Sequence, residues 1–316
     1  MAAIGTNINQ AAELLKAGGL VGIPTETVYG LAANAFQEDA VVNIFKAKNR
    51  PAFDPLITHV ASMEMLTTLV LEIPEDAHKL ITKYWPGPLT VVLPKSARIN
   101  NLITSGLASA AFRMPRHELL HQLLNVLDFP VVAPSANPFG YVSPTSAAHV
   151  NQQLGDKIDY ILDGGECKIG LESTIISFIT EQPTILRLGG LSVEDIEAEI
   201  GKVAVNTLST SKPNSPGMFS SHYAPTKPVV LGEIEDLLEE NDFRKIGILS
   251  FSKKYSDYPN FVLSQRASVE EAAKNLFTGL RWFENQDVEM IITENAPDKG
   301  LGKAINDRLN RASRSK

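Results

Sequence analysis

The residues best suited to chemistry include two cations beside a proline. Lys48 and Arg50 stand in the stretch Lys-Ala-Lys-Asn-Arg-Pro, which ends at Pro51. A lysine offers a phosphate a point charge, and an arginine offers it a planar fork of N–H donors. The alternative is a solvated helix end, where cations suit the helix dipole. In isolation the motif favours the helix end, so phosphate binding depends on the residues that surround it.

Two more arginines end short apolar stretches. Arg113 closes Ser-Ala-Ala-Phe-Arg, and Arg187 closes Thr-Ile-Leu-Arg. Burying a guanidinium is unfavourable unless an anion pairs with it. For Arg113, the sequence is equally consistent with a carboxylate of the protein and with the carboxylate of a ligand.

Hydroxyl and amide side chains gather in three turns. Thr25 stands in Pro-Thr-Glu-Thr-Val-Tyr-Gly-Leu, Ser135 and Asn137 in Ala-Pro-Ser-Ala-Asn-Pro, and Ser173 and Thr174 in Gly-Leu-Glu-Ser-Thr. Ligands of α/β proteins commonly meet such groups at strand ends, where Ser135 and Asn137 would bond phosphate or ribose oxygens. Taken alone, Thr25 is better explained as a helix N-cap, and serine and asparagine also bond their own backbone in turns.

The composition excludes several classes of protein. The chain has 316 residues, a net charge of −7 and one cysteine, Cys167. A single cysteine allows no internal disulfide and no thiolate zinc cluster, and it suits a reducing compartment. His-Glu-x-x-His, Walker and Gly-x-Ser-x-Gly motifs are absent, and no paired histidine supports Cys167 as a nucleophile. Nothing resembles a signal peptide or an apolar run of about 18 residues, so we expect a cytoplasmic protein.

Residues 1–203 have the pattern of one α/β domain. Helical periodicity predicts helices at Asn7–Lys16 and Asp39–Lys46, and two more before the Trp-Pro-Gly-Pro turn at 85–88. Short apolar runs predict strands at Leu20–Ile23, Leu56–Val60, Leu89–Leu93, Ser109–Phe112, Val131–Ala133, Ile158–Leu162, Ser173–Phe178 and Thr184–Leu188. This alternation predicts a mixed sheet covered by helices.

The remaining residues predict a linker and a second domain. Residues 204–227 are rich in Ser, Thr, Pro and Gly, yet Met218, Phe219, His222 and Tyr223 are unusual for a spacer, so we expect a linker that acts as a lid. Residues 228–316 restart a βα pattern around the amphipathic helix Val269–Phe283. They predict a small Rossmann-like domain, in which the absence of Gly-x-Gly-x-x-Gly gives no reason to expect dinucleotide binding.

Taken in order, these motifs resemble the YrdC/YciO-like family. The set is Pro-Thr-Glu-Thr-Val-Tyr-Gly-Leu, Lys-x-Lys-x-Arg-Pro, Trp-Pro-Gly-Pro-Leu-Thr, Arg-Met-Pro, Ala-Pro-Ser-Ala-Asn and Glu-Ser-Thr-Ile. Ser-Pro-Gly-Met and His-Tyr-Ala-Pro in the linker resemble the two-domain form. The resemblance implies a twisted mixed sheet around a concave basic cavity. It also implies synthesis of L-threonylcarbamoyladenylate from L-threonine, bicarbonate or CO2 and ATP, with pyrophosphate release, for modification of tRNA next to the anticodon.

The resemblance implies two sets of binding residues as well. Those matching ATP-binding positions are Lys48, Arg50, Ser109, Ser135, Asn137, Ser143, Arg187 and Tyr223. Those matching L-threonine-binding positions are Thr25, His59, Arg113, Ser173 and Thr174. Within these sets Arg113 would face the substrate carboxylate and Tyr223 would close over the nucleotide. Asp54 and Phe139 depart from the family, which often has Asn and Ser there.

The implied chemistry needs no covalent enzyme intermediate and no protein metal site. We expect Mg²⁺ to be bound through the ATP phosphates, and His59 to be a candidate base for the threonine amine. The product would pass to a tRNA-modifying transferase complex, while the acidic net charge disfavours a stable RNA complex. The alternatives are a non-catalytic RNA-binding module and a carbamoyl-transfer enzyme of hydrogenase maturation. The second would need a zinc-finger segment that one cysteine cannot supply.

Overall fold

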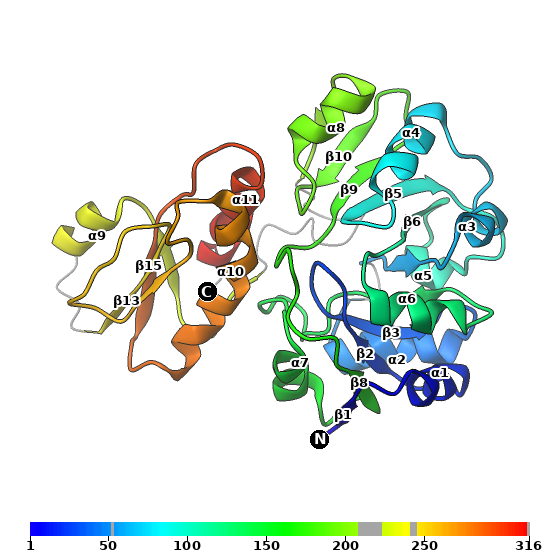
Figure 1. Cartoon of the computed structure of the whole chain (residues 1–316), viewed down its shortest axis with the longest axis horizontal. Helices are drawn as coiled ribbons and strands as arrows, with labels where there is room; N and C mark the ends of the chain where they lie inside the picture. The colour runs from blue at the N-terminus through cyan, green and yellow to red at the C-terminus, as the bar shows by residue number, and fades with distance from the viewer. Residues whose placement is uncertain (52–53, 208–222, 241–244, 315–316) are drawn as a thin grey trace.

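The computed structural model describes residues 1–51, 54–207, 223–240 and 245–314, and their strands form two sheets (Figure 1). The sheet of the first domain has the order β1-β8-β2-β3-β7-β4-β6-β5-β9-β10-β11. Its strands are β1 (Ala3–Gly5), β2 (Val21–Ile23), β3 (Gly30–Asn34), β4 (Ile57–His59), β5 (Leu89–Pro94), β6 (Ser109–Arg113), β7 (Val131–Val132), β8 (Tyr160–Leu162), β9 (Thr174–Ser177), β10 (Thr184–Arg187) and β11 (Ala204–Val205). Parallel and antiparallel pairs alternate irregularly, which confirms the predicted mixed sheet.

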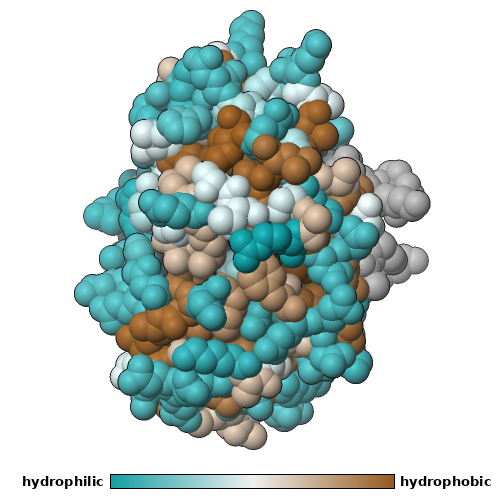
Figure 2. All heavy atoms as spheres, turned by 90° about the vertical axis from the view of Figure 1, so that its right-hand side faces the viewer, coloured by the Kyte–Doolittle hydropathy of each residue, from teal (hydrophilic) through white to brown (hydrophobic). Residues whose placement is uncertain are grey.

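Helices cover this sheet. They are α1 (Ile8–Lys16), α2 (Glu38–Lys48), α3 (Met63–Leu69), α4 (Glu75–Tyr84), α5 (Asn101–Thr104), α6 (Glu118–Asn125), α7 (Ala147–Leu154) and α8 (Val193–Ile200). The face turned away from the second domain is mainly hydrophilic, with apolar patches between the hydrophilic side chains (Figure 2). Within the described residues, no helix is both long and apolar enough to cross a bilayer.

The end of α2 sets the direction of the predicted phosphate motif. The helix continues two residues beyond its predicted end and stops at Asn49, whose φ of 51° is left-handed. Asparagine tolerates this conformation at a helix C-terminus. The turn leaves Lys48 inside the last helical turn and places Arg50 beyond it. The two cations are therefore positioned by different parts of the backbone.

The second sheet is parallel, as predicted for a small Rossmann-like domain. Its order is β12-β15-β13-β14, formed by Val229–Leu231, Met290–Thr293, Ile246–Ser250 and Asn260–Val262 respectively. Its helices are α9 (Ile234–Glu240), α10 (Val269–Trp282) and α11 (Gly302–Ser313), with a 3-10 turn at Phe283–Asn285. The predicted apolar face of α10, which includes Leu276, Phe277 and Leu280, is fully buried.

Helices α10 and α11 lie between the second sheet and the first domain (Figure 1). Arg281 of α10 donates to the carbonyl of Val142 and, over 2.8 Å, to the side chain of Gln153. The Tyr141 hydroxyl donates to Glu284 over 2.8 Å. The two domains are thus joined by polar contacts as well as by the chain between them.

The predicted division into residues 1–203, 204–227 and 228–316 stays a proposal. β11 pairs with β10 and adds two residues of the predicted linker to the first sheet. Within that linker, Met218, Phe219 and His222 lie outside the described residues. Tyr223 is described, and its ring stacks on Phe277 with 5.6 Å between centroids.

Gly170 is required where the first domain meets α10. Its φ is 77°, and a Cβ atom there would lie 2.4 Å from the Lys274 carbonyl oxygen. Gly106 also has a positive φ, 82°, but nothing lies within 4 Å of its Cβ position. We expect Gly170→Ala to lower the free energy of unfolding by at least about 2 kcal/mol more than Gly106→Ala. Urea unfolding of both variants measures the difference, and equal losses would mean that the contact with α10 is unimportant.

Candidate functional site

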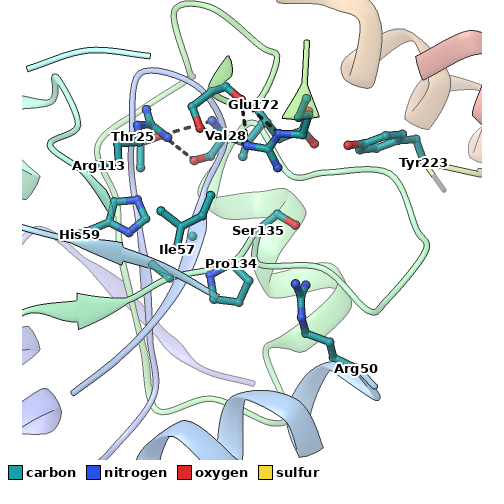
Figure 3. A pocket seen from close by; sticks show the side chains of 14 residues that line it. Thr25, Val28, Arg50, Ile57, His59, Arg113, Pro134, Ser135, Glu172 and Tyr223 are labelled. Carbon is teal, nitrogen blue, oxygen red and sulfur yellow. Dashed lines mark hydrogen bonds between the residues drawn. The ribbon is translucent and has the colours of Figure 1, made fainter. Parts of the chain in front are cut away.

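A cavity that contains many polar and charged side chains lies on the sheet of the first domain, and one residue of the linker, Tyr223, also lines it (Figure 3). Its empty space is about 560 Å³, counted with the part that opens to solvent. The lining residues are Thr25, Val28, Gly30, Arg50, Ile57, His59, Arg113, Ala133, Pro134, Ser135, Glu172, Ser173, Arg187 and Tyr223. Eight of them belong to the two predicted binding sets: Thr25, Arg50, His59, Arg113, Ser135, Ser173, Arg187 and Tyr223.

Strand pairing brings one end of the cavity together. β4 and β6 are parallel neighbours, and His59 and Arg113 are the paired last residues of these strands. Ser173 directly precedes β9, and its hydroxyl lies 2.7 Å from that of Thr90 at the start of β5. In Figure 3, His59 and Arg113 occupy one end of the cavity, while Arg50 and Tyr223 lie toward the other.

Two of the lining arginines are paired with carboxylates of the protein. Arg113 lies 2.8 Å from Glu26, and Arg50 lies 2.8 Å from Asp54. Arg50 also donates to the carbonyl of Pro55 over 2.8 Å. The protein carboxylate predicted as one possible partner of Arg113 is therefore present. Both arginines nevertheless line the cavity.

Arg187 differs from Arg50 and Arg113 in the groups to which it bonds. It is 6% exposed and donates to the carbonyl and the hydroxyl of Ser173. Within the described part of the chain, no carboxylate lies within ion-pair distance of Arg187. Burial lowers the pKa of this arginine to about 10, which still leaves it charged at neutral pH. A buried, charged guanidinium on a cavity wall is a site for an anionic ligand.

The cavity has an excess of positive charge although the chain as a whole is acidic. The buried ionisable groups that line the cavity, or bond to its lining, are Lys48, Arg50, Arg113, Arg187, Arg308, Glu26, Asp54 and Glu172. Among those that line the cavity itself, three arginines, Arg50, Arg113 and Arg187, face one carboxylate, Glu172, an excess of two positive charges on the described lining. Such a local field attracts multiply charged anions even when the net charge is −7.

Lys48 lies behind the cavity wall. Its ammonium donates to the carbonyls of Ser135, over 2.5 Å, and Asn137. Burial and the neighbouring Arg50 lower the pKa of Lys48 well below its ordinary value. The Asn137 side chain in turn donates to the carbonyls of Pro138 and Tyr141. Lys48 and Asn137 therefore hold the loop that presents Ser135, and the turn chemistry considered for Asn137 is present.

Two predicted threonines bond their own surroundings. The Thr25 hydroxyl donates to the Val28 carbonyl and accepts from the amides of Thr27 and Val28, so it stabilises a turn, not a helix N-terminus. Thr25 nevertheless lines the cavity. The Thr174 hydroxyl donates to the Leu191 carbonyl and is not part of the lining.

Ser109 and Ser143 lie apart from the main lining. Ser109 belongs to a neighbouring groove on the same domain, together with Val92, Leu186 and Asn206. Ser143 is fully buried, and its hydroxyl donates to Glu172 over 2.6 Å. In this arrangement Ser143 reaches the cavity only through that carboxylate.

Sequence reasoning assigned no role to Glu26, Glu172 or Arg308. Glu172 lines the cavity, and Arg308 from α11 donates to it over 3.0 Å. The helical pattern of α11 does contain a signal for Arg308. Arg308 comes four residues after Ala304 and three residues after Ile305, so it lies on the buried face of the helix.

Two titratable groups of the site are held neutral. Burial, together with Arg113, lowers the pKa of His59 to about 3, so His59 is an uncharged imidazole at neutral pH. Its Nδ1 atom has no hydrogen-bond partner among the described residues. Burial raises the pKa of the Cys167 thiol to about 12, which argues against a thiolate nucleophile, as expected.

The residues around the cavity do not form a protein metal site. Within the part of the chain that the structure describes, no group of three or more His, Cys, Asp and Glu side chains is arranged to hold a metal ion. The carboxylate that lines the cavity, Glu172, is already bonded to Ser143 and Arg308.

The fold and cavity define a class: two-domain α/β proteins with a buried cationic site on a twisted mixed sheet. The chain belongs to the Sua5/YciO/YrdC family, whose model, described as "Telomere recombination", matches residues 13–189. A second family model, described as "Threonylcarbamoyl-AMP synthase, C-terminal domain", matches residues 191–314. These assignments confirm the resemblance that the motifs indicated.

Similar proteins extend over nearly the whole chain. A threonylcarbamoyl-AMP synthase of Pyrococcus abyssi is 45% identical over 97% of this chain and 94% of its own length. One of Bacillus subtilis is 42% identical over 97% of this chain and 92% of its own length. The crystal structure of P. abyssi Sua5 complexed with L-threonine matches with a TM-score of 0.92 at 42% identity, covering 99% of this chain and 97% of that one.

The neutral state of His59 has a consequence for stability. Its pKa is about 3 in the fold against an ordinary value of 6.5, so the unfolded chain binds more protons between these values and stability falls as pH drops through this window. Lowering the pH from about 7 to about 5 should therefore cost the wild type about 2 kcal/mol more than His59→Asn. Urea unfolding, followed by Trp85 fluorescence in a Trp282→Phe background, measures this. Equal pH dependence in both proteins would mean that His59 titrates normally in the fold.

Proposed function

We propose that this protein is a threonylcarbamoyl-AMP synthase, a nucleotidyltransferase that converts L-threonine, bicarbonate or CO2 and ATP into L-threonylcarbamoyladenylate and pyrophosphate. The observation that carries this proposal is Arg187, a buried guanidinium on the cavity wall with no protein carboxylate among the described residues. Relatives that bear this name are similar over almost their full length.

The two ends of the cavity suit two different substrates. Arg113, His59 and Ser173 provide a cation, an imidazole without a partner at Nδ1, and a hydroxyl. These groups match the carboxylate and polar hydrogens of an amino acid, and the P. abyssi structure carries L-threonine. At the other end, Arg50 and the Ser135 loop suit phosphate oxygens, with Arg187 between the two ends.

The reaction fits a site built for positioning and charge stabilisation. The threonine amine adds to CO2 and loses a proton, which gives a carbamate. A carbamate oxygen then attacks the α-phosphorus of ATP, and pyrophosphate leaves. Negative charge develops on the phosphoryl oxygens in this step, and preorganised arginines stabilise it. His59 is poorly suited to carry away the amine proton, because its pKa is about 3, so we assign it a hydrogen-bonding role.

Binding of Mg²⁺ and the later use of the product are part of the same proposal. Since the described residues form no protein metal site, Mg²⁺ would enter with ATP as a counter-ion of its phosphates. The adenylate would then serve a transferase complex that modifies tRNA. A cytoplasmic location agrees with the single, buried Cys167.

The proposal is tested by pyrophosphate release from ATP and Mg²⁺. Release should require both L-threonine and bicarbonate, and the product should have the mass of threonylcarbamoyladenylate. Reactions that omit one of the two substrates are the controls. Release that is indifferent to threonine would reject the proposal, and a protein that binds RNA but releases no pyrophosphate would favour an RNA-binding role.

Replacing Arg113 should affect threonine more than ATP. We expect Arg113→Ala to raise the KM for L-threonine at least ~10-fold, because the cation at that end of the cavity is lost, while the KM for ATP changes less than ~3-fold. Arg116→Ala is the matched control, since Arg116 is exposed and donates to the Pro86 carbonyl. Steady-state kinetics with each substrate varied in turn provides the comparison. An unchanged KM for threonine would remove Arg113 from the threonine site.

Both cations of the Lys-x-Arg motif should be needed for turnover. We expect Arg50→Ala and Lys48→Ala each to reduce turnover at least ~10-fold, which corresponds to a loss of about 1.4 kcal/mol of transition-state stabilisation. Lys46→Ala, an exposed lysine of the same helix, should leave turnover unchanged. Rates close to wild type in both of the first two variants would contradict a phosphate-binding role for the motif.

A further inference from the structure

One side chain of the second domain contacts two residues that line the cavity. Arg308 is fully buried, and its guanidinium bonds Glu172, 136 positions earlier in the sequence, through two nitrogen atoms. It also lies over the ring of Tyr223, 5.1 Å from the centroid. Glu172 and Tyr223 both line the cavity, although Arg308 itself does not.

Glu172 is held from two sides. Ser143 donates to its Oε1 atom over 2.6 Å, and Arg308 donates to its Oε2 atom over 3.0 Å. Burial alone would favour the neutral acid, but Arg308 and Arg187 together hold the pKa of Glu172 below its ordinary value. Glu172 is therefore a carboxylate whose two oxygens both have donors from outside the cavity.

Arg187 interacts electrostatically with Glu172. The carboxylate acts electrostatically on Arg187, yet no ion pair forms between them, and Arg187 donates instead to Ser173. Ser173 directly follows Glu172 in the chain, and a Cβ atom on Gly189 would lie 2.3 Å from the Glu172 carbonyl oxygen. The backbones of the two segments are thus tightly packed, and the side chains of Glu172 and Arg187 line the same cavity.

We propose that Arg308 is a positioning residue that keeps Glu172 away from Arg187 and so leaves Arg187 free to bind the nucleotide. This rests on the proposed function, because it deepens the role of Arg187 at the same site. If Arg308 is lost, Glu172 becomes a buried carboxylate with one donor fewer, and Arg187 is the cation within its reach. The nucleotide would then compete with a carboxylate of the protein. The second domain would accordingly be required for affinity as well as for stability.

The test is ATP binding by calorimetry on the full chain, together with steady-state kinetics. We expect Arg308→Met to weaken ATP binding and raise the KM for ATP at least ~10-fold, with the KM for L-threonine changed less than ~3-fold. Arg308→Lys should retain an intermediate affinity, because a lysine still supplies one donor to Glu172. Glu284→Ala is the matched control, since Glu284 accepts a hydrogen bond from Tyr141 across the same domain interface and does not line the cavity.

The decisive protein is the double variant Glu172→Gln with Arg308→Met. It has no carboxylate to capture Arg187, so it should recover most of the ATP affinity that Arg308→Met loses. It also removes both partners of a buried ion pair, which is better tolerated than removing one. No recovery would overturn the proposal and would point to direct contact between Arg308 and ATP. An equal loss in Glu284→Ala would overturn it as well, by showing that any weakening of the interface has this effect.

The outcome is separable from the proposed function. Binding of ATP is measured without turnover, so a wild-type protein that binds ATP but forms no threonylcarbamoyladenylate would reject the function and leave the test of Arg308 intact. Conversely, an active wild type with unchanged ATP binding in Arg308→Met would reject only the role of Arg308.

Discussion

The cost of burying positive charge governs this structure. Arg50, Arg113, Arg187 and Arg308 are all less than a tenth exposed, and an isolated guanidinium in such surroundings is strongly unfavourable. Carboxylates of the protein offset that cost for three of them, and Arg187 relies on the hydroxyl and carbonyl of Ser173. With the function proposed above, this incomplete compensation would give the cavity its affinity for anions, and a bound phosphate or carboxylate would supply the charge that the protein leaves out.

The same constraint links the two domains. The first sheet supplies the walls of the cavity from the ends of β4, β6 and β10, but the charge of Glu172 is balanced from α11. Tyr223 lines the cavity while its ring stacks on Phe277 of α10. A substitution of Arg308, which does not itself line the cavity, would therefore alter the charge balance of the site.

The parts of the fold that were predictable have a strong local pattern. The strands before His59 and Arg113 are short apolar runs, and α10 shows a clear helical periodicity, so both were predicted correctly. β3 was missed because Gly-Leu-Ala-Ala-Asn contains few residues typical of strands. The site residues came from motifs, whereas Glu172 and Arg308 belong to a contact across 136 positions that no local pattern specifies. The sequence also could not distinguish Lys48, which holds a loop, from Arg50, which faces the cavity.

The order of strands in the first sheet implies a slow and late folding step. β1 pairs with β8, so Ala3 must find Tyr160, and the amide of Asn7 bonds the hydroxyl of the same tyrosine. Contacts between residues so distant in the chain carry a large loop-closure cost and are formed slowly. During synthesis, β2 and β3 can pair as soon as both exist, but their outer edge stays uncovered until β8 has left the ribosome. Nascent chains of this protein therefore expose an unpaired strand for as long as the ribosome takes to add well over a hundred residues, a period in which chaperones would have most to protect.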